Sequence, residues 1–331
     1  MSPAALFGVE FADPALERAI RDGLDAVEVL LADAVHSDDE FVAGAARHLV
    51  DAGGKRFRPL VTLLASHFGE ASRPEIVPSA VVCEITHLAT LYHDDVMDEA
   101  PVRRGAPSAN ARWDNTVAIL TGDFLFSRAS LILADLGSYA VRLQAQTFAR
   151  LVTGQIRETV GPAAGDDPIA YYLAVLADKT GSLIATAAEF GAHFAGVSAP
   201  VVDRLRTFGE QIGVAFQLSD DILDIASTST ESGKTPGTDL REGVPTLPVL
   251  YALRSAASDS RLASLVSRPL VADDEHAEAL ALLRASSALD EARDTLRTYA
   301  DTARATLADL PDVPARDALE ALTEIVIART G

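Results

Sequence analysis

The stretch LYHDDVMD at residues 91–98 places three carboxylates in a helix whose preceding turns are apolar, namely Asp94, Asp95 and Asp98. A second stretch of the same form, QLSDDILD at residues 217–224, contains Asp220, Asp221 and Asp224. Carboxylates in such surroundings carry a desolvation cost of several kcal/mol each unless a cation neutralises them. Because the pattern occurs twice, it favours a pair of metal-binding motifs over two solvated helix ends.

Both motifs suit a hard divalent cation. Residues four positions apart lie one helical turn above each other, so the first and last aspartates of each motif share a face. The middle aspartate points about 100° away and can act from the flank or through water. Mg²⁺ takes one or two protein carboxylates and completes its octahedron with water and phosphate oxygens, whereas Zn²⁺ sites are built from Cys and His. Incomplete cages of this kind favour Mg²⁺ over Ca²⁺ or Zn²⁺.

The composition around the motifs predicts an all-α fold. Alanine and leucine are abundant and aromatic residues make up only 6% of the chain, which favours helices over strands. Helical periodicity runs over residues 15–34, 39–52, 59–67, 78–98, 109–136, 139–160, 168–194, 200–226 and 246–257, and in shorter pieces over 258–327. The breaks are too short to be linkers between domains. We expect one domain over residues 1–331, with a long loop at 227–246 that could close over a ligand.

Charge and cysteine content exclude several other classes of protein. The net charge of −20 would repel a phosphate backbone, so we expect no nucleic-acid binding. Cys83 is the lone cysteine, which excludes an intramolecular disulfide and suits a reducing compartment. The N-terminal residues lack the basic region of a signal peptide, and no uninterrupted apolar run of about 18 residues is present. We therefore expect a cytoplasmic protein.

In such an acidic chain, a phosphate-bearing ligand has to be held by cations or by a local basic patch. The loop GGKRFRP at residues 53–59 puts three cations into a turn that its two glycines make tight, and Pro59 suits the first turn of the next helix. Arginine binds phosphate with two parallel hydrogen bonds and lysine adds a point charge, which is typical of a diphosphate clamp. Further candidates lie near the motifs or in loops, namely His87, Arg103, Arg104, Lys179, Thr180 and Lys234.

Five stretches together resemble the trans-isoprenyl diphosphate synthases, also called the polyprenyl synthetase family. They are GGKRFRP, HDDVMDEAPVRRG, KTGSLIATAAEFGA, GVAFQLSDDILD and GKTPGTDLREGVPTLP, which follow in the family's order. The resemblance implies the isoprenoid-synthase helical bundle around a deep central cavity, and a homodimer. It also implies a prenyltransferase that joins isopentenyl diphosphate to an allylic diphosphate, with three Mg²⁺ ions per active site when substrate is bound.

The resemblance also implies roles for residues at matching positions. The metal ligands would be Asp94, Asp98 and Asp220, supported by Asp95, Asp221 and Asp224, and Lys179 would join them as a catalytic residue. Isopentenyl diphosphate would contact Lys55, Arg58, His87 and Arg104. The allylic diphosphate would face Arg103, Lys179, Thr180, Gln217 and Lys234. One departure lies at residues 242–244, EGV, where the family usually has EGK, so Arg241 or Lys234 would have to replace a lysine contact.

These residue types suit the chemistry of chain elongation. Breaking an allylic C–O bond leaves a carbocation and a departing diphosphate, whose charge Mg²⁺, Arg and Lys can stabilise. A dry apolar cavity keeps water away from the cation. The double bond of isopentenyl diphosphate then attacks, and a proton is lost to the released diphosphate, which is the base that the resemblance implies. No side-chain nucleophile is required.

Product length is predicted from the residues before Asp94. Short-chain members of the family resemble one another in having aromatic residues at the fourth and fifth positions before the first aspartate, where this chain has Thr90 and Ala89. Small side chains there, and Thr86 further along the helix, leave a channel open by about 5 Å per helical turn. We expect an all-trans product longer than C20 for a quinone side chain, made from a farnesyl or geranylgeranyl primer.

Three alternatives stay open. A geranylgeranyl or farnesyl diphosphate synthase would have the same motifs and differ in product length. A class I terpene cyclase resembles this chain in fold and first motif, but usually lacks the second DDxxD and GGKRxRP. A non-catalytic subunit that tunes a partner's chain length tends to lose one or both acidic motifs. The expected partners are the two diphosphate substrates and a second copy of the chain, with at most transient membrane contact for product release.

Overall fold

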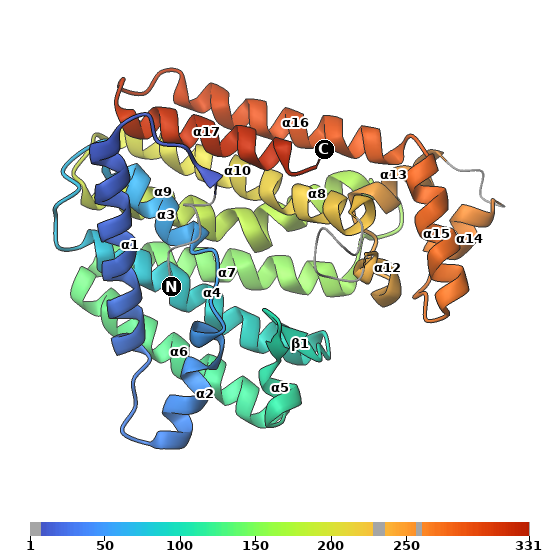
Figure 1. Cartoon of the computed structure of the whole chain (residues 1–331), viewed down its shortest axis with the longest axis horizontal. Helices are drawn as coiled ribbons and strands as arrows, with labels where there is room; N and C mark the ends of the chain where they lie inside the picture. Colours follow the sequence, from blue (N-terminus) through green and yellow to red (C-terminus); the bar gives the residue numbers. More distant parts are fainter. Residues whose placement is uncertain (1–7, 228–235, 256–259, 331) are drawn as a thin grey trace. The chain divides into compact units, whose positions relative to one another are not determined.

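The secondary structure is almost entirely helical, which confirms the predicted all-α fold (Figure 1). The computed structural model describes residues 8–227, 236–255 and 260–330. The helices are α1 (Pro14–Ala34), α2 (Glu40–Asp51), α3 (Phe57–Ser66), α4 (Ile76–Met97), α5 (Ala109–Arg112), α6 (Asn115–Leu136), α7 (Ser138–Val160), α8 (Pro168–Leu176), α9 (Ser182–Phe194), α10 (Ala199–Ala226), α12 (Thr238–Glu242), α13 (Leu247–Ser255), α14 (Arg261–Val266), α15 (Asp273–Ala285), α16 (Ala288–Leu307) and α17 (Pro314–Ala328). A π-helix, η2 (Ala177–Gly181), separates α8 from α9, and the strands β1 (Val102–Arg103) and β2 (Ala106–Pro107) form an antiparallel hairpin.

Several helices begin where the local sequence supplies a cap. The carboxylates of Asp13 and Asp39 accept backbone N–H groups in the first turns of α1 and α2. Pro14 and Pro168 occupy the first positions of α1 and α8, where an N–H would have no partner within the helix. These helix starts are therefore determined by residues next to them in the sequence.

One predicted helix is two helices in the structure. The periodic stretch 109–136 is interrupted at Asp114, whose backbone is extended and whose carboxylate accepts the N–H of Val117 at 2.8 Å. Asp114 therefore caps α6 instead of continuing α5. Periodicity misses this break because Ala109 of α5 and Ala118 of α6 are buried in the same core.

The chain divides into two compact units. Unit 1 comprises residues 1–149, 183–209 and 309–319, and unit 2 comprises residues 150–182, 210–308 and 320–331. The helices α7, α10 and α17 contribute residues to both, so the division does not follow chain order. The single domain expected over residues 1–331 stays a prediction.

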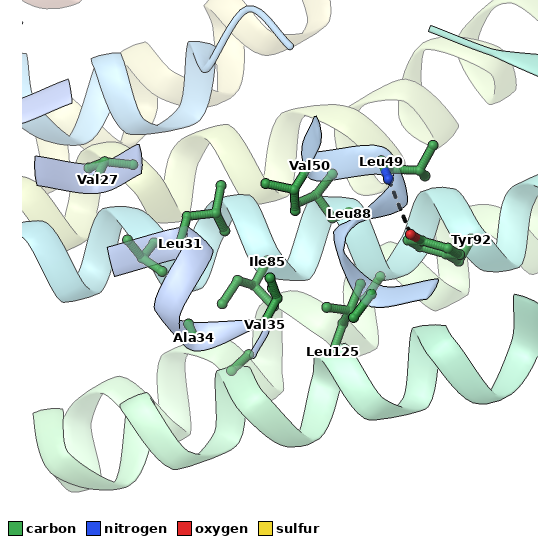
Figure 2. Packing of buried hydrophobic residues seen from close by; sticks show 14 of the residues in the cluster. Val27, Leu31, Ala34, Val35, Leu49, Val50, Ile85, Leu88, Tyr92 and Leu125 are labelled. Atoms are coloured by element: carbon green, nitrogen blue, oxygen red, sulfur yellow. Dashed lines mark hydrogen bonds between the residues drawn. The ribbon is translucent and has the colours of Figure 1, made fainter. Parts of the chain in front are cut away.

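The core of unit 1 is built around α4, which packs against α6, α3 and α1. Apolar side chains of α1, α2, α4 and α6 form one buried cluster that includes Leu31 and Ile85 (Figure 2). Tyr92 of α4 lies in this cluster, where its hydroxyl donates to the carbonyl oxygen of Ala45 at 2.6 Å and accepts the N–H of Leu49 at 3.2 Å. The helix therefore carries the first acidic motif on a buried and hydrogen-bonded support.

Burial extends around most of α4. Cys83 is fully buried, and burial raises the pKa of its thiol to about 12. On the side facing α6, a Cβ atom at Gly122 would lie 2.3 Å from Nε2 of His93 and 3.1 Å from the carbonyl oxygen of Ala89. A side chain at this position would require His93 to move, and glycine avoids that. Ala89 is fully buried and belongs to the apolar cluster of unit 1.

The core of unit 2 consists largely of C-terminal helices. The helix α13 packs against α16, α14, α8 and α15. Along α16, buried side chains recur at Leu296, Ala300, Ala303 and Leu307, which is the spacing of one helical face. The C-terminal part of α10 also belongs to this unit and carries the second acidic motif.

Apolar side chains are exposed on α6. Ile119, Leu120 and Leu131 are 42%, 61% and 58% exposed. In the part of the chain that the structure describes, α6 is the one helix long and apolar enough to cross a membrane, with a mean hydropathy of 1.6 in a window of which 33% is buried. Helices of soluble proteins meet the same criterion, so composition alone does not make α6 a membrane span. Its exposed side chains instead mark an apolar surface that no other described residue covers.

Candidate active site

The first acidic motif lies at the C-terminal end of α4, with Asp98 as the C-cap. Asp98 is exposed and Asp94 partly buried, whereas Asp95 is fully buried, so the middle aspartate differs from the outer two as the helical spacing predicts. Nε of Arg103 donates to Oδ1 of Asp95 at 2.6 Å, and Oδ2 is buried without a hydrogen-bond partner among the described residues. Burial raises the pKa of Asp95, and the Arg103 guanidinium opposes that rise.

The hairpin β1–β2 follows this motif and positions two arginines. Arg104 and Gly105 have φ values of +54° and +77°, the left-handed pair expected in a two-residue hairpin turn. Nη1 of Arg104 donates to the carbonyl oxygen of Leu49 at 2.9 Å and also to that of Gly53. The hairpin therefore directs Arg103 towards the first motif and Arg104 towards the loop GGKRFRP.

The basic loop at residues 53–59 belongs to unit 1 and leads into α3, with Arg56 as the N-cap at a φ of +49°. Lys55 is exposed and Arg58 is partly buried. Burial lowers the pKa of Arg58, and nearby Glu84 opposes that effect. The pKa of His87 is held well below its ordinary value by burial and by the surrounding arginines, so its imidazole is neutral near pH 7.

Sequence reasoning missed the acidic partners of the basic loop. Glu84 is buried in α4, where its Oε1 accepts from Nη1 of Arg56 at 3.0 Å and lies 3.9 Å from Nη2 of Arg104. Glu28 of α1 binds the other edge of Arg56, with Nε to Oε1 at 2.5 Å and Nη2 to Oε2 at 3.1 Å. The only signal in the sequence was one glutamate inside the apolar run SAVVCEITHLAT.

The second acidic motif lies at the C-terminal end of α10, in unit 2. Asp221 is buried, and it accepts hydrogen bonds from the hydroxyl of Tyr172 and from Nε2 of Gln217, the latter at 3.2 Å. Burial raises the pKa of Asp221 to about 7, and these two donors oppose the rise. Tyr172 was not predicted, because nothing in its local sequence links it to the motif.

The outer aspartates of the second motif also have partners within unit 2. Nη2 of Arg329 donates to Oδ1 of Asp220 at 2.5 Å. The carboxylate of Asp224 accepts the backbone N–H groups of Thr238 and Asp239 at 3.1 and 3.2 Å, which anchors the start of α12. Asp220, one of the three residues that the resemblance assigns to a metal, is therefore already paired with a cation.

Lys179 and Thr180 lie in the π-helix η2, a rare element that recurs at functional sites. Nζ of Lys179 is 2.5 Å from Oε2 of Glu158, and Oγ1 of Thr180 donates to Oε1 of Gln217 at 3.4 Å. Unit 2 therefore brings Thr180 and Gln217 together with Asp221. Residues assigned from two distant stretches of sequence thus form one hydrogen-bonded chain.

The stretch that follows the second motif contains α12. Arg241, one of the two candidates to replace the missing lysine contact, donates to Oδ1 of Asp273 at 2.7 Å. The backbone N–H of Val244 donates to the carbonyl oxygen of Asp239 at 2.9 Å. The other candidate, Lys234, lies outside the described residues.

The three chain-length candidates on α4 have different surroundings. Thr86 is buried, and its Oγ1 accepts from Nε2 of Gln144 in α7 at 2.8 Å. Thr90 is also buried and donates to the carbonyl oxygen of His87 at 2.8 Å, and Ala89 is fully buried in the apolar cluster of unit 1. Gln144 additionally lines a cavity of about 280 Å³ in unit 1, together with Phe126, Leu133 and Phe148. Thr86 is therefore linked to an apolar space through Gln144.

The donor set of the motifs suits a cation that shares its coordination with a ligand. Among residues 8–227, 236–255 and 260–330, no group of three or more His, Cys, Asp or Glu residues is arranged to hold a metal ion. The motifs nevertheless supply carboxylate oxygens, the donors that Mg²⁺ prefers, and Asp95 has a buried oxygen without a partner in the described structure. These residues fit a divalent cation that is completed by oxygens from outside the protein.

An all-α fold, two aspartate motifs at helix ends and a basic loop beside the first motif define a prenyltransferase of the isoprenoid-synthase class. Residues 39–283 match the family described as polyprenyl synthetase. The chain belongs to this family.

Relatives match along nearly the whole chain. It is 51% identical to a nonaprenyl diphosphate synthase of Mycobacterium tuberculosis, over 98% of this chain and 97% of the relative. A dimethylallyltranstransferase of the same organism is 41% identical over 99% of both chains. The crystal structure of a geranylgeranyl pyrophosphate synthase from Corynebacterium glutamicum, complexed with calcium and isoprenyl diphosphate, is 49% identical with a TM-score of 0.86, over 98% of this chain and 100% of that chain.

Proposed function

We propose that this protein condenses isopentenyl diphosphate with an allylic diphosphate in repeated 1′–4 steps. The product is an all-trans polyprenyl diphosphate longer than C20, which supplies a quinone side chain. The observation that carries the proposal is the 51% identity, over 98% of the chain, to a nonaprenyl diphosphate synthase. The small side chain of Thr90, one helical turn before Asp94, supports a long product because it adds no aromatic ring there.

Asp94, Asp98 and Asp220 are the proposed metal ligands. Bound Mg²⁺, with three ions per active site in the presence of substrate, would stabilise the negative charge of the departing diphosphate. The calcium and isoprenyl diphosphate in the Corynebacterium structure support a divalent cation used together with a diphosphate. Asp95 and Asp221 are held by Arg103 and by Tyr172, and so keep the ends of the two helices in place.

The proposed roles of the other site residues are those that the resemblance implies. Lys55, Arg58, His87 and Arg104 serve isopentenyl diphosphate, and Arg103, Lys179, Thr180, Gln217 and Lys234 serve the allylic diphosphate. His87 is neutral, so it contributes a hydrogen bond and no charge. The allylic C–O bond breaks first, the double bond of isopentenyl diphosphate then attacks the carbocation to form the new C–C bond, and the released diphosphate takes the proton. The protein orients the reactants and excludes water.

The exposed apolar face of α6 supports a homodimer. Ile119, Leu120 and Leu131 would be removed from water by a second copy, at about 25 cal/mol for each Å² of apolar surface buried. We place the protein in the cytoplasm, where its lone cysteine stays reduced. Contact with a membrane would be transient and limited to release of the apolar product.

Geranylgeranyl diphosphate synthesis is the second candidate function. The Corynebacterium structure, at 49% identity, is of an enzyme with that name. Both activities need the same motifs and the same chemistry, and they differ in the step at which elongation stops. Product length alone therefore separates them.

Product analysis tests both candidates. Purified protein is incubated with farnesyl diphosphate and labelled isopentenyl diphosphate, with Mg²⁺ or with EDTA, and the hydrolysed products are separated by chromatography. We expect labelled products longer than C20 with Mg²⁺, and loss of incorporation with EDTA. Products that stop at C20 would replace the long-chain proposal by the second candidate. Incorporation that persists in EDTA would exclude the metal-dependent mechanism.

A further inference from the structure

Glu84 is a buried carboxylate to which the proposed reaction assigns no role. It lies in the middle of α4 and its side chain is 2% exposed. Its Oε1 is 3.0 Å from Nη1 of Arg56 and 3.9 Å from Nη2 of Arg104. One buried carboxylate therefore connects the basic loop at residues 53–59 with the hairpin β1–β2, two segments that are distant in the sequence.

Every nitrogen of the Arg56 guanidinium is engaged by the protein. Nε and Nη2 donate to Glu28, Nη1 donates to Glu84, and Nη2 also reaches the carbonyl oxygen of Val50 at 3.4 Å. Four of its five N–H groups are used in these bonds, so Arg56 could not bind a diphosphate with two parallel hydrogen bonds without breaking one of them. It is therefore a structural support of the loop, and its neighbours Lys55 and Arg58 are the residues proposed to bind the ligand.

The backbone at both arginines is held in a conformation that non-glycine residues seldom adopt. Arg56 and Arg104 have φ values of +49° and +54°, in the left-handed region. Such a conformation persists where surrounding contacts hold it, often at functional sites. Glu84 approaches both guanidinium groups. Removing its charge would therefore loosen both the loop at residues 53–59 and the hairpin β1–β2.

We propose that Glu84 is a positioning residue for isopentenyl diphosphate. By binding Arg56 and Arg104 it fixes the backbone of the basic loop, so that Lys55 and Arg58 are presented to the diphosphate. This role rests on the proposed function for the identity of the ligand. A positioning role for Glu84 requires only that the loop at residues 53–59 binds a diphosphate group.

The charge of Glu84 and its positioning role predict opposite changes in diphosphate affinity, which makes the proposal testable. A negative charge buried among arginines weakens the positive potential that attracts an anion. Electrostatics alone therefore predicts tighter diphosphate binding when Glu84 is neutralised. Positioning predicts weaker binding, because the loop loses the contact that orders it.

The substitution Glu84→Gln keeps the size of the side chain and removes its charge. We expect the KM for isopentenyl diphosphate to rise about tenfold or more, as the loss of a hydrogen bond between charged groups commonly causes. The KM for the allylic diphosphate should change less than about twofold, within the range of surface substitutions. Metal-free binding of inorganic diphosphate, measured by calorimetry, should weaken in parallel with the first KM. Glu70→Gln removes the exposed partner of Arg73 in unit 1 and should leave all three quantities unchanged.

A second pair of variants keeps the test decisive if Glu84→Gln does not fold. Arg56→Gln breaks the same contact from the other side and should raise the same KM. The double variant Glu84→Gln/Arg56→Gln has neither charge of this pair, and its binding should be close to that of Arg56→Gln alone, because Arg56→Gln already lacks the contact with Glu84.

Three outcomes would overturn the proposal. They are diphosphate binding by Glu84→Gln that is unchanged or tighter, an equal rise of both KM values, and an unchanged KM in Arg56→Gln. A wild-type protein that binds inorganic diphosphate but condenses no substrates would refute the proposed function instead. In that case the calorimetric comparison would still decide the role of Glu84.

Discussion

The two acidic motifs have the same sequence pattern, but their aspartates are held differently. In the first motif the buried Asp95 is bound by a charged group, Arg103, and Asp98 is exposed at the helix end. In the second motif the buried Asp221 is bound by neutral donors, with Tyr172 among them, and both outer aspartates have partners in unit 2. Two motifs with the same sequence pattern therefore differ in the residues that bind their aspartates.

The difference bears on what a ligand has to displace at each motif. Asp220 is paired with Arg329, so a metal ion that binds there exchanges one cation for another. Asp98 has an exposed carboxylate, so a metal ion that binds there mainly displaces water. Substitutions of equivalent residues in the two motifs measure how far this difference reaches into catalysis and stability.

The largest expected effect is common to both motifs. Asp94→Ala and Asp220→Ala should each lower kcat by roughly 1,000-fold, because each removes a proposed ligand of the ions that stabilise the leaving group. Turnover of isopentenyl diphosphate at saturating substrate measures the effect. Asp25→Ala, at an exposed position of α1, is the matched control and should leave kcat unchanged. A kcat within tenfold of wild type for either motif variant would remove that residue from the metal site.

A smaller effect on kcat is expected at only one of the two motifs when the hydroxyl of a tyrosine near the middle aspartate is removed. Tyr172→Phe leaves a buried oxygen of Asp221 without a donor, a loss that costs about 1–3 kcal/mol, and we expect kcat to fall roughly tenfold. Tyr92→Phe removes a buried hydroxyl that binds only backbone groups of α2. It should lower the melting temperature and leave the kcat of folded protein intact. If Tyr172→Phe altered only the melting temperature, Tyr172 would be a structural residue and no part of the site.

The smallest expected effect concerns stability at the last aspartate of each motif. Asp224→Ala removes the acceptor for two backbone N–H groups at the start of α12, which should cost about 1 kcal/mol of unfolding free energy. Asp98→Ala removes a negative charge at the C-terminus of α4, where the helix dipole disfavours it, and should cost nothing. Urea unfolding of the two metal-free proteins compares them directly. Equal losses would show that capping does not distinguish the motifs.

The helices that carry the motifs are predictable because they are long and periodic. The pattern predicts residues 78–98 and 200–226, and the structure has Ile76–Met97 and Ala199–Ala226. Candidate residues four positions apart on one helix can likewise be found from spacing alone. The six aspartates are therefore the part of the site that sequence reasoning identifies most directly.

Partners that are distant in the sequence cannot be found in this way. Tyr172 reaches Asp221 across 49 positions, and Arg329 reaches Asp220 across 109, so only tertiary packing brings them together. The π-helix is equally hidden, because residues 168–194 form one periodic stretch. Ala89 is fully buried in the cluster that also contains residues of α6, and its role in product length stays a prediction.

The buried thiol of Cys83 gives α4 its own reporter of local opening. The thiolate is the reactive form, and burial raises the pKa of this thiol to about 12, so an alkylating reagent modifies it only when the helix separates from its neighbours. Because Cys83 is the lone cysteine, the labelling rate at constant pH reports the free energy of opening around α4. Labelling with and without diphosphate and metal would then measure how much binding energy reaches the helix that ends in the first motif.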